Sequence, residues 1–183
     1  MPTTPFDSLH PEFRRHVVPL LEAIEHAAGA DSEDPTDLAE MIAEKPEWDA
    51  AMSWATEQLV RGRYDVAGGV AYTLPFLHPN FARWLAVRAE AIGEFAPNPD
   101  EQPDYQIPEI VLRDRDPALH DHLAGCAVFL RAWTALIWQR VPTELTSIQF
   151  ARYAPEGTAH GHWHHDAVSD ISAVTSLDPD RFT

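Results

Sequence analysis

Apolar residues recur at helical spacing through the first third of the chain, and prolines divide the pattern into segments. Proline is favoured in the first turn of a helix, so each proline that precedes such a segment indicates a helix start. The pattern predicts helices over residues 11–28 with an interruption near Pro19, over residues 35–44, and over residues 46–61. We therefore expect residues 1–66 to form a helical N-terminal region that ends near the Gly68–Gly69 pair.

Strand-like and helix-like segments follow one another in the rest of the chain without a regular β-α-β repeat. Strands are expected over residues 69–77, 107–113, 145–153 and 171–177. Helices are expected from Pro79 to a stop at Gly93 and, as the longest one, from Asp116–Pro117 to Val141, whereas residues 96–106 should form an exposed loop. This order favours an α+β domain in which helices support a sheet.

Composition narrows the functional classes. The 183 residues are 45% hydrophobic, enough for one sizeable core with a small helical extension. With 13 basic against 29 acidic residues and a formal net charge of −16, binding to nucleic acid or to an anionic membrane is not expected. Cys126, the single cysteine, cannot form an internal disulfide and is expected to be a small buried hydrophobe. No signal peptide or membrane-spanning run is present, so a cytoplasmic protein is expected.

A histidine-rich segment carries the candidate chemistry, because 4 histidines between residues 160 and 165 are followed by Asp166. On an extended backbone His164 and Asp166 point to the same side, so both can converge on one metal ion, while His165 points away. With a second histidine they would form a 2-His-1-carboxylate Fe(II) site. His162 is an alternative ligand, although no carboxylate lies two residues after it. A surface segment that binds zinc or nickel adventitiously is the other interpretation.

The segment around these residues resembles the 2-oxoglutarate- and Fe(II)-dependent dioxygenases, in particular the prolyl-4-hydroxylase-like branch. The resemblance spans residues 67–183, and its specific motifs are Arg152–Tyr153, residues 155–157, His164-x-Asp166 and Leu177-Asp178-Pro179-Asp180. It implies a jelly roll (double-stranded β-helix) with buttressing helices, Fe(II) as cofactor and 2-oxoglutarate as co-substrate. It also implies that Tyr153 hydrogen-bonds 2-oxoglutarate, although a purely structural tyrosine fits equally well. A carboxylate at Asp166 favours hydroxylation over the halogenation seen where the family has a small residue.

Two features of the family pattern have no counterpart here. The family places a second metal-binding histidine downstream of H-x-D, and a Lys or Arg beyond it for 2-oxoglutarate. The sequence after Asp166 contains no histidine, and Arg181 is the only lysine or arginine in that part. We therefore expect an oxygenase domain truncated at its C-terminus, or a homodimer or partner chain that supplies the missing groups. The competing hypothesis is a non-catalytic metal-binding or interaction module.

Three further side chains outside the histidine-rich segment have expected roles. Arg152 is expected to pair with an acid on a neighbouring strand rather than to bind substrate. His120 and His122 lie two residues apart on a predicted helix, which places them on different faces and argues against a shared metal site. The substrate, either a small molecule or a peptide, is not specified by the sequence.

Overall fold

The computed structural model describes residues 2–30, 35–66, 69–99, 106–154 and 169–177. The chain divides into two compact units and passes between them more than once; one of these passages lies within helix α6, between Gly125 and Cys126. The helical unit contains residues 6–78 and 126–142, and the sheet unit contains residues 1–5, 79–125 and 143–183. Helices and antiparallel strands are both present, which confirms the α+β class.

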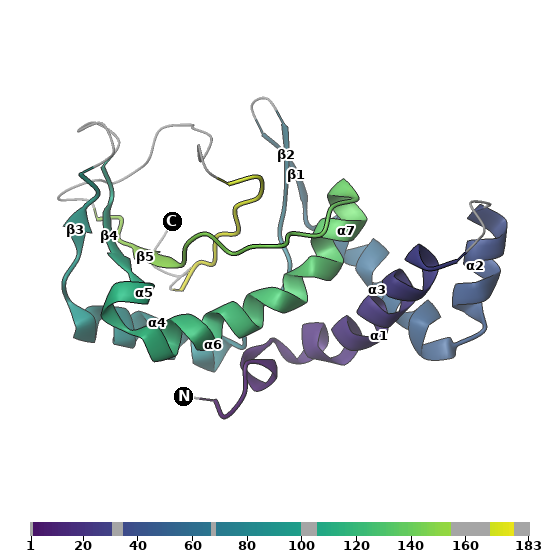
Figure 1. Cartoon of the computed structure of the whole chain (residues 1–183), viewed down its shortest axis with the longest axis horizontal. Helices are drawn as coiled ribbons and strands as arrows, with labels where there is room; N and C mark the ends of the chain where they lie inside the picture. Colours follow the sequence, from purple (N-terminus) through teal and green to yellow (C-terminus); the bar gives the residue numbers. More distant parts are fainter. Residues whose placement is uncertain (1, 31–34, 67–68, 100–105, 155–168, 178–183) are drawn as a thin grey trace. The chain divides into compact units, whose positions relative to one another are not determined.

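The helical unit is built on α1, which packs against α3 and α7 (Figure 1). Its elements are the 3₁₀ turn η1 (Phe6–Ser8), α1 (Pro11–Ala28), α2 (Pro35–Ala43), α3 (Pro46–Arg61), β1 (Arg63–Val66), β2 (Gly69–Tyr72), the 3₁₀ turn η3 (Val128–Leu130) and α7 (Arg131–Trp138). The three helices predicted within residues 1–66 are confirmed. The domain boundary proposed near Gly68 stays a prediction; Val66 and Gly69 pair across the β1–β2 hairpin there.

Helix α1 continues through Pro19, so the predicted interruption was wrong. A proline inside a helix removes one hydrogen bond and costs roughly 3 kcal/mol. On α1 the side chains of Phe13, Val17, Leu20 and Ala23 are all 0% exposed. Full burial of one large apolar side chain contributes about 1.5–3 kcal/mol, so this face outweighs the cost of the proline.

Aromatic side chains fill the centre of the helical unit around Phe13. The Phe13 ring lies 5.4 Å from that of Phe76, 6.2 Å from Trp54 and 6.3 Å from Trp133, measured between centroids. The first two pairs are edge-to-face, an arrangement that the ring quadrupole favours. The core of this unit therefore joins residues from α1, α3, α7 and the segment after β2.

The sheet unit carries a three-stranded antiparallel sheet in the order β3-β4-β5 (Figure 1). Its elements are α4 (Pro79–Ile92), β3 (Ala96–Pro97), β4 (Pro108–Val111), α5 (Leu112–Arg115), α6 (Pro117–Ala127, as far as the division) and β5 (Gln149–Ala151). Ile110 of β4 pairs with Phe150 of β5, and both side chains are buried. This buried pair fixes the register of β5, because a slip of one residue would turn both side chains to the opposite face.

The long helix predicted from Asp116 to Val141 is divided, so that prediction was wrong. Helix α6 ends at Ala127, the turn η3 follows, and α7 ends at Trp138; the longest helix is α1, with 18 residues. A 3₁₀ turn advances with fewer residues per turn than an α-helix and so changes which residues of the next helix share a face. On α7 the buried side chains are Ala132, Trp133 and Thr134, while Trp138 is 46% exposed.

The strands are shorter than the hydrophobic runs that predicted them. Only residues 69–72, 108–111 and 149–151 of the first three predicted strands form ladders. Residues 171–177 form no strand in the structure, and Val174 is 95% exposed. Part of the predicted loop over residues 96–106 instead supplies β3. Hydrophobic alternation marks residues able to enter a sheet, but the ladder ends where the neighbouring strand no longer offers backbone partners.

None of the helices in the described part of the chain combines the length and the apolar content that crossing a membrane requires.

Candidate functional site

The strand that precedes the histidine-rich segment is β5, which ends at Ala151, directly before Arg152 and Tyr153. Tyr153 is 39% exposed, so its side chain is accessible from solvent. The predicted metal ligands His164 and Asp166, and the alternative His162, lie outside the described residues, and their role stays a prediction. Among the residues that are described, no group of 3 or more His, Cys, Asp or Glu side chains is arranged to hold a metal ion.

Arg152 anchors the end of β5. Its backbone N–H donates to the carbonyl oxygen of Pro108 at 2.9 Å. Its guanidinium group forms an ion pair with Glu90 at 2.5 Å and stacks over the Phe95 ring, 3.9 Å from the centroid. The acid therefore comes from helix α4 and not from a neighbouring strand, which corrects the sequence prediction. These contacts hold the backbone immediately before Tyr153.

Two contacts connect the start of β5 to other parts of the sheet unit. The backbone N–H of Leu112 donates to the carbonyl oxygen of Ile148 at 3.1 Å. The hydroxyl groups of Thr146 and Ser169 lie 3.4 Å apart. This contact brings Ser169 close to Thr146, three residues before β5 begins.

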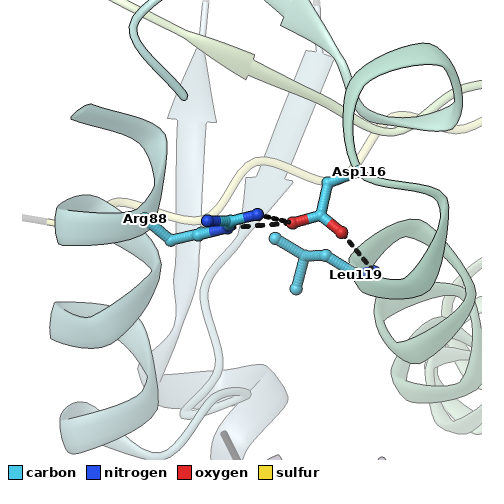
Figure 2. Close-up of polar contacts among 3 residues, drawn as sticks. All are labelled: Arg88, Asp116 and Leu119. Carbon is cyan, nitrogen blue, oxygen red and sulfur yellow. Dashed lines mark hydrogen bonds and ion pairs between the residues drawn. The ribbon is translucent and has the colours of Figure 1, made fainter. Parts of the chain in front are cut away.

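Asp116 fixes the start of α6, as Figure 2 shows. One oxygen, Oδ1, accepts a hydrogen bond from the backbone N–H of Leu119 at 3.1 Å and so caps the helix. The other, Oδ2, accepts from Nε and an Nη of Arg88 on α4, at 2.9 and 2.8 Å. The same carboxylate thus caps α6 and ties it to α4, which sets the position of the residues in the first turn of α6.

His120, in that first turn, is 9% exposed. Its Nδ1 lies 3.1 Å from a carboxylate oxygen of Asp121, while its Nε2 is buried without a hydrogen-bond partner among the described residues. The side chain borders a hollow of about 250 Å³ in the sheet unit. The hollow is lined by Val111, Arg113, Asp114, His120, Thr146, Ser147 and Ile148.

In the sequence, His120 stands out only as a possible metal pair with His122, and the hollow is not apparent. His122 contacts a different group, the ring of Phe81 on α4, with 5.5 Å between ring centroids. Burial disfavours its charged form and lowers the pKa of His122 below its ordinary value. The two histidines therefore have separate surroundings, as their spacing predicts. In the sequence, Arg113 and Asp114, the charged members of the lining, resemble ordinary surface residues.

Cys126, in the helical unit, is 1% exposed. Burial raises the pKa of its thiol to about 11, although a hydrogen bond with the Ser8 side chain acts in the opposite direction. The prediction of a small buried hydrophobe is confirmed.

Comparison of the chain with protein-family models, with curated proteins and with solved structures finds no match in any of the three. The function is therefore argued from the residues themselves.

Proposed function

We propose that this protein is an Fe(II)- and 2-oxoglutarate-dependent oxygenase that hydroxylates a C–H bond of a small-molecule or peptide substrate. One observation carries the proposal: His164-x-Asp166 lies in the sequence between a strand that is followed by Arg152–Tyr153 and the motif Leu177-Asp178-Pro179-Asp180. We infer that residues 67–183 belong to the jelly-roll class of domain that such enzymes use.

Two features of the sheet unit support this proposal. Strand β5 ends directly before Arg152, at the place in the sequence that the resemblance requires. The contact of Thr146 with Ser169 brings a residue that follows the H-x-D motif in the sequence close to the segment that precedes the same strand.

The donor chemistry of the proposed ligands fits Fe(II). A neutral imidazole from His164 and a carboxylate from Asp166 are two of the three protein donors in a facial site, which keeps three positions open. The third donor would be His160, His162 or a histidine of a second chain. When bound, Fe(II) with 2-oxoglutarate and O2 supplies the oxidation: the substrate gains a hydroxyl group, and 2-oxoglutarate becomes succinate and CO2.

Tyr153 and Arg152 would have different roles at such a site. The phenol of Tyr153 is partly exposed at the end of β5 and would donate a hydrogen bond to 2-oxoglutarate. Arg152 is engaged by Glu90 and Phe95, so it would hold the backbone of Tyr153 in place rather than bind the co-substrate.

Anaerobic titration of the chain with Fe(II) in the presence of 2-oxoglutarate tests the proposal. A weak visible charge-transfer band appears only when 2-oxoglutarate chelates Fe(II), so it reports the assembled site rather than metal binding alone. We expect the band in the unmodified chain and its loss in His164→Ala and in Asp166→Ala. His165→Ala and Asp170→Ala are the matched controls and should retain it, because neither residue is a proposed ligand.

Other outcomes would contradict the assignment. Metal binding without the band, unaffected by Asp166→Ala, would identify a histidine-rich metal trap and favour the non-catalytic alternative. A band that survives His164→Ala but is lost in His162→Ala would move the imidazole ligand to His162.

A further inference from the structure

The hollow beside His120 brings opposite charges together. Arg113 and Asp114, both exposed residues of α5, contribute a guanidinium group and a carboxylate to its lining. Neither side chain forms an ion pair or a side-chain hydrogen bond with another residue in the described ranges. Thr146 and Ser147 add two hydroxyl groups, whose contacts with Ser169 and Gln149 are long, at 3.4 and 3.5 Å. The hollow therefore offers both a cationic and an anionic group for a ligand.

The imidazole of His120 adds a buried polar atom. Because the carboxylate of Asp121 can only accept, it favours the tautomer that carries its proton on Nδ1. Nε2 is then an acceptor, and a buried acceptor without a partner is unfavourable. The His120 ring thus adds a polar group to the wall of the hollow, while Nε2 itself is enclosed by the protein.

We propose that this hollow binds a small zwitterion of the α-amino acid class. Asp114 would receive the ammonium group, and Arg113 with the hydroxyl groups of Thr146 and Ser147 would hold the carboxylate. The lining places acceptors for the first group and donors for the second within one hollow. The proposal uses none of the predicted metal ligands and stands independently of the proposed oxygenase activity.

Size and apolar lining restrict the ligand further. A volume of about 250 Å³ is smaller than the roughly 300–1,000 Å³ typical of pockets for drug-sized ligands. Val111 and Ile148 are the apolar members of the lining, and they would contact an aliphatic side chain. A free aliphatic amino acid such as L-valine satisfies both conditions.

Titration of the full ¹⁵N-labelled chain, followed by amide chemical shifts, tests this proposal with three probes. L-Valine carries both charges, 3-methylbutanoate lacks the ammonium group, and isobutylammonium lacks the carboxylate. We expect saturable shifts at residues 112–115 and 146–148 with L-valine. Each single-charge analogue should bind at least about tenfold more weakly, because it forfeits one set of charge-assisted hydrogen bonds.

Matched variants separate the two charges. Arg113→Gln and Asp114→Asn change exposed side chains and should each weaken L-valine binding about tenfold or more while the fold is kept. Arg131→Gln and Asp49→Asn alter exposed residues of the helical unit and should leave the affinity unchanged. His120→Phe should also weaken L-valine binding. If the His120→Phe variant does not fold, Arg113→Gln and Asp114→Asn still test the proposal.

Two results would overturn the proposal. If 3-methylbutanoate binds as tightly as L-valine, the hollow is a simple anion site on Arg113. If L-valine causes no saturable shift at these residues, or if the control variants lose affinity as much as the α5 variants, the hollow is not an amino-acid site.

Discussion

The carboxylate of Asp116 performs two tasks at once, so its removal should cost more than the loss of either. Asp116→Ala deletes the cap of α6, which is worth about 1 kcal/mol, within a range of roughly 0.5–2 kcal/mol. It also deletes the pair with Arg88, whose side chain is 42% exposed while that of Asp116 is 14% exposed. Solvent screening at Arg88 limits this second contribution to about 1 kcal/mol. We expect a loss of about 2 kcal/mol in the free energy of unfolding.

Two milder substitutions separate the contributions. Asparagine caps a helix as well as aspartate does, so Asp116→Asn should lose only the charge and cost about 1 kcal/mol or less. Arg88→Gln removes the same pair from the other side and should cost a similar amount. The double variant Asp116→Asn/Arg88→Gln should cost less than the sum of the two single variants, because each single variant removes the same ion pair.

Urea unfolding followed by far-UV circular dichroism measures the free energies, and hydrogen exchange at the α4 and α6 amides locates the effect. Asp114→Ala is the control, since this side chain is an exposed acid of the neighbouring helix α5. Its cost should stay within about 0.5–1 kcal/mol. The reasoning is refuted if Asp116→Ala costs no more than this control. If Asp116→Asn costs as much as Asp116→Ala, the cap is not a separate contribution.

Two further perturbations test the packing and the electrostatics. Gly62→Ala should destabilise the helical unit by about 1–3 kcal/mol, because the added Cβ would lie 2.1 Å from the backbone oxygen of Thr73. Gly69→Ala is the control and should cost much less, because nothing lies within 4 Å of its added Cβ. Thermal unfolding measures both costs, and equal costs would contradict the reasoning. The pKa of His122 in the folded protein lies below its unfolded value of 6.5, so the unfolded state binds more protons as the pH falls. The free energy of unfolding should therefore decrease as pH falls below about 6.5. In urea titrations between about pH 7 and 5, His122→Gln should reduce that loss, and an unchanged pH dependence would count against it.

Helix boundaries were the most predictable part of this fold, because their signals are local. A proline in the first turn starts most of the helices, at Pro11, Pro35, Pro46, Pro79 and Pro117. The α4 stop at Gly93 was also predictable, since φ there is +69°, a conformation that glycine adopts without strain. The same rules failed at Pro19, where burial of Phe13, Val17, Leu20 and Ala23 decided the outcome. Local signals therefore predict a boundary only where tertiary packing does not oppose them.

Strand lengths and the chain's division could not be predicted from local patterns. Residues 145–153 and 171–177 both have apolar character, but only the former contributes a strand, because β4 offers a ladder to residues 149–151. The chain passes from the sheet unit to the helical unit within the last turn of α6, just before the break between α6 and α7. Pairing and unit membership both depend on residues far away in the sequence.

For the candidate sites, the sequence indicated which residues carry reactive or charged groups, but not which residues lie next to them in the fold. It singled out His164, Asp166 and Tyr153 from a short motif, whereas the Arg152–Glu90 pair joins residues 62 positions apart. No local sequence pattern predicts such a pair, since each partner alone resembles an ordinary charged surface residue. The same holds for the hollow, where α5 and residues 146–148 come together only because β5 pairs with β4.

The Arg152–Glu90 pair also links the proposed function to the fold. Tyr153 follows a strand of only three residues, and a ladder this short gives its end limited rigidity. Three contacts compensate at Arg152: the hydrogen bond to Pro108, the ion pair with Glu90 and the stacking on Phe95. If Tyr153 does hold 2-oxoglutarate, its position depends on α4 as much as on the sheet. An arginine that contacts neither metal nor co-substrate would then decide whether the tyrosine is in place.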